Sequence, residues 1–82
     1  MMVDTKVLFE DIILKILLLE KEQIDDNVSR DDLEEWDSMT HLALVSELEQ
    51  VFDIILSDDM VTEIQTIGDI KKTLAKFDVK VT

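Results

Sequence analysis

The sequence predicts an all-α fold, a small four-helix bundle of three long helices and one short one with a long first loop. The 82 residues include no proline and a single glycine, whereas strands in so small a protein are usually joined by turns that contain these residues. Apolar residues recur at spacings of three and four, the period of a helix with one buried face. Hydrophobic residues make up 46% of the chain, so we expect residues 1–82 to form one folded domain.

The first helix is predicted from about Thr5 to Leu19, with Asp4 or Thr5 as its N-cap. Its buried side is expected to comprise Leu8, Ile12, Ile13, Ile16, Leu17 and Leu19. From about Glu20 to Asp37 the periodicity is lost, and a loop of this length in a compact domain is uncommon. We expect isolated apolar residues to anchor this loop, namely Ile24, Val28, Leu33 and Trp36.

The second helix is predicted from Ser38 to Phe52. Its core-facing stripe is expected to be Leu42, Val45, Leu48 and Phe52. Because successive residues of a helix are about 100° apart, another set of residues lies on a different face, which is expected to be exposed and weakly charged. That face comprises Met39, Ala43, Ser46, Glu47 and Gln50.

Two shorter helices are predicted to follow. Ser57 precedes two aspartates, which is typical of a capped first turn, so a short helix is expected from Asp58 to Ile64. Thr66 and Asp69 match a capping box ahead of the last helix. The apolar residues of that helix are Ile67, Ile70, Leu74 and Phe77, and the chain after Phe77 is expected to fray.

The negative charge is confined to the central half of the chain. Residues 31–70 contain 12 of the 20 acidic residues and no Lys or Arg, while the remaining 8 acidic and 8 basic residues cancel. The whole net charge of −12 therefore lies in this segment. Such a field repels nucleic acid and anionic membranes and attracts basic protein surfaces.

The composition also excludes several other classes of protein. No cysteine is present, so neither disulfides nor thiolate metal sites are available. The chain has no signal-peptide pattern and no apolar run of about 20 residues. We therefore expect a cytoplasmic protein without membrane insertion or nucleic-acid binding, acting as a monomer.

Ser38 is the most informative candidate for chemistry, because Asp37-Ser38 stands where the second helix begins. Either residue could simply cap the helix. A phosphate-linked group on Ser38 is the functional alternative, since backbone N–H groups and the positive dipole end would partly offset its charge. His41 lies one turn further on, but with no oxyanion donors or cavity in view we expect no enzyme, and we place His41 at the surface or its boundary.

Metal binding is not expected either. The acidic runs of the first loop lack the spaced oxygen ligands and the central glycine of a calcium-binding loop.

Three segments together resemble acyl carrier proteins over nearly the whole chain. They are Trp36-Asp37-Ser38-Met39-Thr40-His41-Leu42, the helix end at residues 48–53 and the helix restart at residues 66–70. The resemblance implies that Ser38 carries 4′-phosphopantetheine derived from coenzyme A, with Asp37 assisting its installation, and that acyl cargo is held as a thioester on this arm. It also implies three kinds of partner: a phosphopantetheinyl transferase (holo-carrier synthase), an acyl-loading ligase or transferase, and acyl-processing enzymes with basic docking surfaces.

The resemblance further implies roles for two sets of residues. Partner binding is expected at Met39, Thr40, Ala43, Glu47, Glu49, Gln50 and Asp53. An acyl pocket between the second and third helices would be lined by Leu48, Leu56, Val61 and Ile64. Ordinary core packing is an equal alternative for these four.

Departures from carriers of primary fatty acid synthesis indicate a free-standing carrier for a dedicated pathway. Thr40, Ala43 and Gln50 stand where those carriers commonly have acidic residues, and Glu34-Glu35-Trp36 lacks their loop glycine. Two alternatives remain open. One is an aminoacyl or peptidyl carrier, including one for D-alanine, and the other is an acidic helical interaction module in which Ser38 is only a cap.

Overall fold

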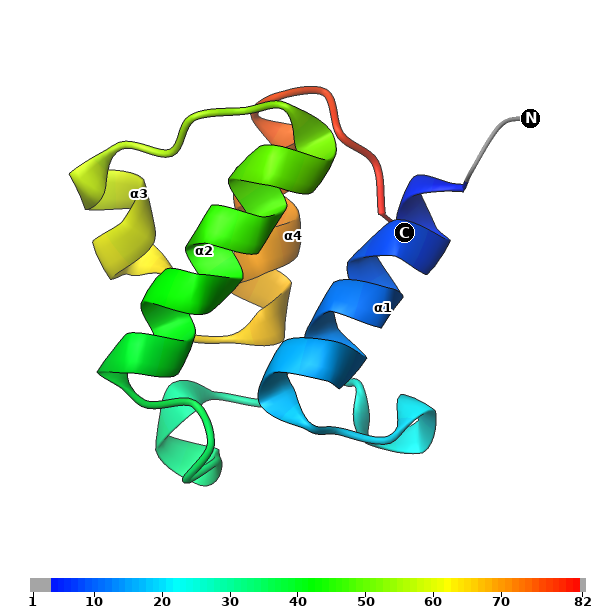
Figure 1. Ribbon diagram of the computed structural model, residues 1–82, viewed down its shortest axis with the longest axis vertical. Coiled ribbons are helices and arrows are strands. Elements are labelled where there is room, and N and C mark those ends of the chain that lie inside the picture. Colours follow the sequence, from blue (N-terminus) through cyan, green and yellow to red (C-terminus); the bar gives the residue numbers. More distant parts are fainter. Residues whose placement is uncertain (1–3, 82) are drawn as a thin grey trace.

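The computed structural model describes residues 4–81, which form helices packed around one apolar core (Figure 1). The helices are α1 (Thr5–Leu17), α2 (Ser38–Phe52), α3 (Asp58–Glu63) and α4 (Ile67–Ala75), and two short 3-10 turns, Lys21–Gln23 and Arg30–Asp32, lie in the first loop. The predicted all-α bundle is confirmed. In residues 4–81 no helix is both long and apolar enough to cross a membrane.

Helix α1 is capped by Asp4, whose carboxylate accepts a hydrogen bond from the backbone N–H of Lys6 at 2.9 Å. It ends two residues earlier than predicted, because Leu18 adopts a left-handed conformation with φ 56°. This turn exposes Leu18 and directs Leu19 into the core from outside the helix. The buried face is formed by Phe9, Ile12, Ile13 and Leu17. Phe9 was not among the predicted residues, and Leu8 and Ile16 are only partly buried.

The first loop is held in place by its apolar anchors, as predicted. Trp36 is buried in the core, and the other three anchors pack against it. Backbone hydrogen bonds that the sequence pattern does not indicate also join the loop to the start of α4, including Ile67 N–H to the carbonyl of Val28 at 3.0 Å. At Gly68 a Cβ would lie 3.1 Å from the carbonyl oxygen of Asp26, which is closer than ordinary van der Waals contact, so this close approach favours glycine.

Helix α2 runs beside α1 in the opposite direction (Figure 1). Its bounds are as predicted, and Val45 and Leu48 of the predicted core stripe are buried, but the prediction is wrong at Leu42. The buried residues are His41, Leu44, Val45 and Leu48. Leu42 is 63% exposed instead, because the spacing that faces the core is 41, 44, 45 and 48. Phe52 is partly buried.

The last two helices begin at their predicted caps, since Ser57 caps α3 and Thr66 with Asp69 forms the capping box of α4. Helix α3 ends at Glu63, one residue early, and Ile64 enters the core from extended backbone. The prediction that the chain frays after Phe77 is wrong. Val81 is buried, and the hydroxyl of Thr5 donates to the carbonyl of Lys80, so the C-terminal segment packs beside α1.

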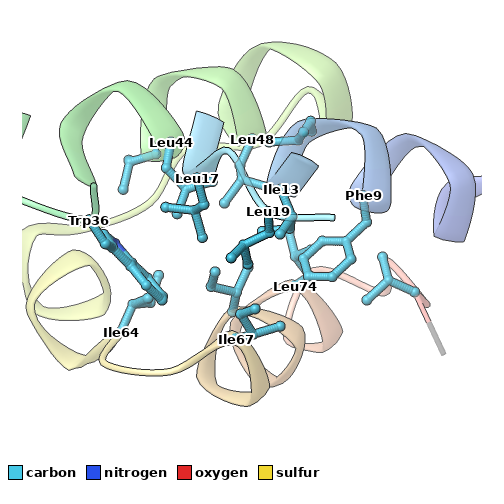
Figure 2. Packing of buried hydrophobic residues seen from close by; sticks show 14 of the residues in the cluster. Phe9, Ile13, Leu17, Leu19, Trp36, Leu44, Leu48, Ile64, Ile67 and Leu74 are labelled. Atoms are coloured by element: carbon cyan, nitrogen blue, oxygen red, sulfur yellow. The ribbon is translucent and has the colours of Figure 1, made fainter. Parts of the chain in front are cut away.

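The core is formed by buried side chains from α1, α2, α4, the connecting segments and the C-terminal segment, and Met60 and Val61 of α3 pack against it (Figure 2). Ile13 and Leu17 of α1 meet Leu44 and Leu48 of α2 on one side. Trp36 lies beside Ile64 at the end of the core near the start of α2. The residues around Ser38 are therefore supported by the core directly beneath them.

Candidate functional site

Ser38 is the first residue of α2 and is exposed to solvent. The cap of the helix is Asp37, whose carboxylate oxygen Oδ1 accepts from the backbone N–H of Thr40 at 2.9 Å. The carbonyl of Asp37 accepts from the backbone N–H of His41 at 2.8 Å. Because Asp37 supplies the cap, the Ser38 hydroxyl is not required for it.

The same contacts keep Asp37 ionised. The hydrogen bond from the backbone N–H of Thr40, and then the Thr40 side chain, lower the pKa of the Asp37 carboxyl below its usual value. The residue before Ser38 therefore carries a negative charge at neutral pH, and its carboxylate is held by the cap hydrogen bond.

Behind Ser38, two hydrogen bonds form what we call the Trp36–His41–Val61 bridge. The indole N–H of Trp36 donates to His41 Nδ1 at 2.9 Å. The His41 Nε2 lies 2.9 Å from the carbonyl oxygen of Val61. Since Nδ1 accepts, the proton of the neutral ring is on Nε2, which donates to Val61. The bridge joins the first loop, α2 and α3.

His41 is buried, with 4% of its surface exposed, so the prediction that it lies at the surface or its boundary is wrong. The hydrogen bonds with Trp36 and Val61 compensate for the loss of hydration of the two ring nitrogens on burial. Burial lowers the pKa of His41, the hydrogen bond to the Val61 carbonyl partly opposes this effect, and the positive charge of Arg30 adds a smaller lowering. Both ring nitrogens are engaged, so the ring is not available as a base for Ser38.

The exposed side of α2 near Ser38 is apolar rather than acidic. Met39 is 82% exposed and Leu42 is 63% exposed. Ala43, Ser46 and Gln50 of the predicted weakly charged face are exposed, as expected, whereas Glu47 of that face is partly buried. Leu42 was missed as a candidate because it was assigned to the core, although its spacing of three from Met39 places both residues on neighbouring turns.

Two glutamates that were predicted to bind partner proteins form contacts within the molecule instead. Glu47 forms an ion pair with Lys15 of α1 at 2.9 Å. A side-chain oxygen of Glu49 accepts from the backbone N–H of Leu56 at 2.8 Å and so holds the α2–α3 connection. Asp53 is exposed at the C-terminal end of α2, where it adopts a left-handed conformation with φ 55°. Thr40, next to the cap, is partly buried.

The sequence matches the protein family described as phosphopantetheine attachment site over residues 8–74. The chain belongs to the acyl carrier protein family. Among solved structures it is similar to a candidate acyl carrier protein from Mycobacterium tuberculosis, with a TM-score of 0.78 and 29% sequence identity. That match covers 89% of this chain and 97% of the other. A comparison with curated proteins finds no match.

The cofactor of this family is a covalently attached 4′-phosphopantetheine, and the geometry at Ser38 suits it. The side chain is exposed, and Ser38 lies in the first turn of α2, where the positive end of the helix dipole favours a phosphate ester. When attached, the group supplies a thiol that forms thioesters. The carboxylate of Asp37 adds negative charge beside this place, but it is directed to Thr40 by the capping hydrogen bond.

The four residues predicted to line an acyl pocket all belong to the core or pack against it. Leu48, Leu56 and Ile64 are buried, and Val61 is partly buried. Hollows of about 440 and 270 Å³ lie elsewhere, over the loop–α4 contact and over α1 near the C-terminal segment, and neither is lined by any of these four residues.

Proposed function

We propose that Ser38 carries 4′-phosphopantetheine and that the protein holds acyl intermediates as thioesters on this arm for presentation to partner enzymes. The observation that supports this most strongly is the exposed Ser38 at the start of α2, with its cap supplied by Asp37, inside the matched segment 8–74. The chain contributes an attachment point and a surface, and it carries out no catalysis of its own.

The test is the intact mass after incubation with coenzyme A and a phosphopantetheinyl transferase. The wild-type protein should gain the mass of one phosphopantetheine group, and Ser38→Ala should gain none. Ser46→Ala, which removes another exposed hydroxyl from the same helix, serves as the control and should be modified as the wild type is. An unmodified wild-type protein would instead support an acidic interaction module in which Ser38 has no arm.

The partners required for this role are the transferase, an acyl-loading ligase or transferase, and acyl-processing enzymes. We assign their docking to the start and exposed face of α2, where Met39 and Leu42 offer an apolar contact. The nearby carboxylates favour partners with basic rims around an apolar centre, because the net charge of −12 attracts such surfaces. We expect the carrier to act in the cytoplasm.

We further propose a dedicated pathway rather than bulk fatty acid synthesis. Ala43 and Gln50, on the exposed face of α2, carry no charge, and neither does the partly buried Thr40. The charge of Glu47 is paired with that of Lys15. A standard fatty acid synthase set should therefore elongate chains poorly on this carrier. The triple variant Thr40→Glu, Ala43→Glu, Gln50→Glu should be elongated better. Efficient elongation on the wild-type protein would contradict the proposal.

An aminoacyl or peptidyl carrier, including one for D-alanine, is the second candidate. It is favoured by the Trp36–His41–Val61 bridge, which holds α2 and α3 together beside the attachment serine. Loading assays with aminoacyl and fatty acyl ligases distinguish the two candidates.

A further inference from the structure

The Trp36–His41–Val61 bridge crosses the contact between α2 and α3. Trp36 precedes α2, His41 lies in its first turns, and Val61 belongs to α3. The indole and the imidazole are buried, with 2% and 4% of their surfaces exposed. Each of the two hydrogen bonds measures 2.9 Å.

The bridge also lies close to the attachment serine. Residues three apart on a helix are surface neighbours, so His41 is adjacent to Ser38 on α2. The apolar residues around this contact are also buried: Ile64 lies beside Trp36, and Leu48 lies two turns further along α2 than His41. A hydrocarbon chain that started at Ser38 and entered between these helices would meet the bridge first.

Opening this contact has a specific cost. The neutral ring of His41 uses one nitrogen as acceptor and the other as donor. Separating α3 from α2 here would break the hydrogen bond between His41 Nε2 and the Val61 carbonyl and leave both groups without this partner. A hydrocarbon chain has no donor or acceptor to replace them, so it would leave buried polar groups unsatisfied.

We infer that His41, positioned by Trp36, closes the α2–α3 contact behind Ser38 and so selects for cargo carried outside the bundle, namely short or polar acyl groups rather than long hydrocarbon chains. The inference rests on the proposed arm at Ser38. His41 acts here as a positioning residue, because it determines where cargo lies without reacting with it.

The experiment compares nuclear magnetic resonance spectra of the carrier loaded from acetyl-coenzyme A and from decanoyl-coenzyme A by a phosphopantetheinyl transferase. Intact mass first establishes loading at Ser38, and an absence of loading would count against the proposed function. The bridge is then tested separately in the unmodified protein, where the Trp36 indole N–H should exchange slowly with solvent. Fast exchange of this proton would overturn the inference whatever the outcome of loading.

In the loaded wild-type carrier, the Trp36 indole N–H and the amides of Leu48 and Ile64 should have the same chemical shifts with both cargoes. His41→Leu places an apolar side chain at this position and removes both hydrogen bonds, and in this variant the two amides should shift with chain length. Trp36→Phe removes one hydrogen bond and should show a smaller shift, which supplies the comparison if His41→Leu does not fold. Thr62→Ala, on the exposed side of α3, should behave as the wild type does. Equal chain-length shifts in the wild type and the bridge variants would overturn the inference.

Discussion

Ser38 and His41 show how two side chains one turn apart acquire different roles. Ser38 is exposed and its helix is capped by Asp37, so its hydroxyl is free for modification. His41 is buried, and both of its ring nitrogens are engaged by Trp36 and Val61. The second residue therefore supports the site rather than activating the first.

Trp36→Phe tests the contribution of the indole N–H at this scale. The substitution keeps an aromatic ring in the core but leaves His41 Nδ1 without its donor. An unsatisfied buried polar atom costs about 1–3 kcal/mol, and the free energy of unfolding should fall by about that amount in urea denaturation. Leu42→Ala, at an exposed position of α2, is the control and should change it by no more than about 0.5 kcal/mol. Equal effects of the two substitutions would contradict the assigned hydrogen bond.

At the scale of the elements, the contact between α2 and α3 should depend on pH. The folded protein holds His41 neutral, so its pKa lies below the usual value of 6.5 and the unfolded chain binds the proton more readily. The stability contributed by the neutral ring is therefore fully present above pH 6.5 and decreases as the pH falls from there toward the folded pKa. Urea denaturation across this range should show the decrease in the wild type. His41→Leu should lack it, and an identical pH profile in both proteins would refute the prediction.

The C-terminal segment is an element that hydropathy alone did not place. Val81 is buried, and the chain before it is joined to Thr5 by a hydrogen bond. Val81→Ala removes two buried carbon groups, which corresponds to a loss of about 1.5 kcal/mol. Thermal or urea denaturation should show this loss, whereas Lys80→Ala, at an exposed position, should be close to neutral. A neutral Val81→Ala would mean that the segment does not contribute to the core.

The helices and their caps could be predicted from the sequence because these signals are local. Asp37 before α2 and Thr66 with Asp69 before α4 act within one turn. The full buried face of α2 could not be predicted from the sequence. Burial of His41 depends on its hydrogen bonds to Trp36, a loop residue, and to Val61, a residue of another helix. A hydrophobicity pattern does not predict the burial of a polar side chain whose hydrogen bonds are made to such distant partners. For the same reason, Leu42 was assigned to the core and was not predicted to be an exposed residue near Ser38.

The path of the first loop could be predicted only in part. Its apolar anchors are visible in the sequence, whereas the hydrogen bonds between its backbone and the start of α4 are not, because they involve no particular side chains. Gly68 is the one residue that carries such a signal, since its small size permits the close approach of Asp26.

At the scale of the whole molecule, the central acidic segment should destabilise the fold through repulsion. Residues 31–70 contain 12 carboxylates and no Lys or Arg, and salt screens interactions between exposed charges. The melting temperature at neutral pH should therefore rise between about 0.01 M and about 0.15 M salt. Replacing the exposed Glu34 and Glu35 by glutamine should reduce the rise. A melting temperature that does not change with salt would show that this charge causes no strain.

The central claim is that Ser38 carries the arm, and the most direct measurement is mass spectrometry of the protein purified from its native host. The account predicts a protein heavier by one phosphopantetheine group or its acyl thioester. Fragmentation should locate the added mass on Ser38. An unmodified protein, or a modification on any other residue, would contradict the account.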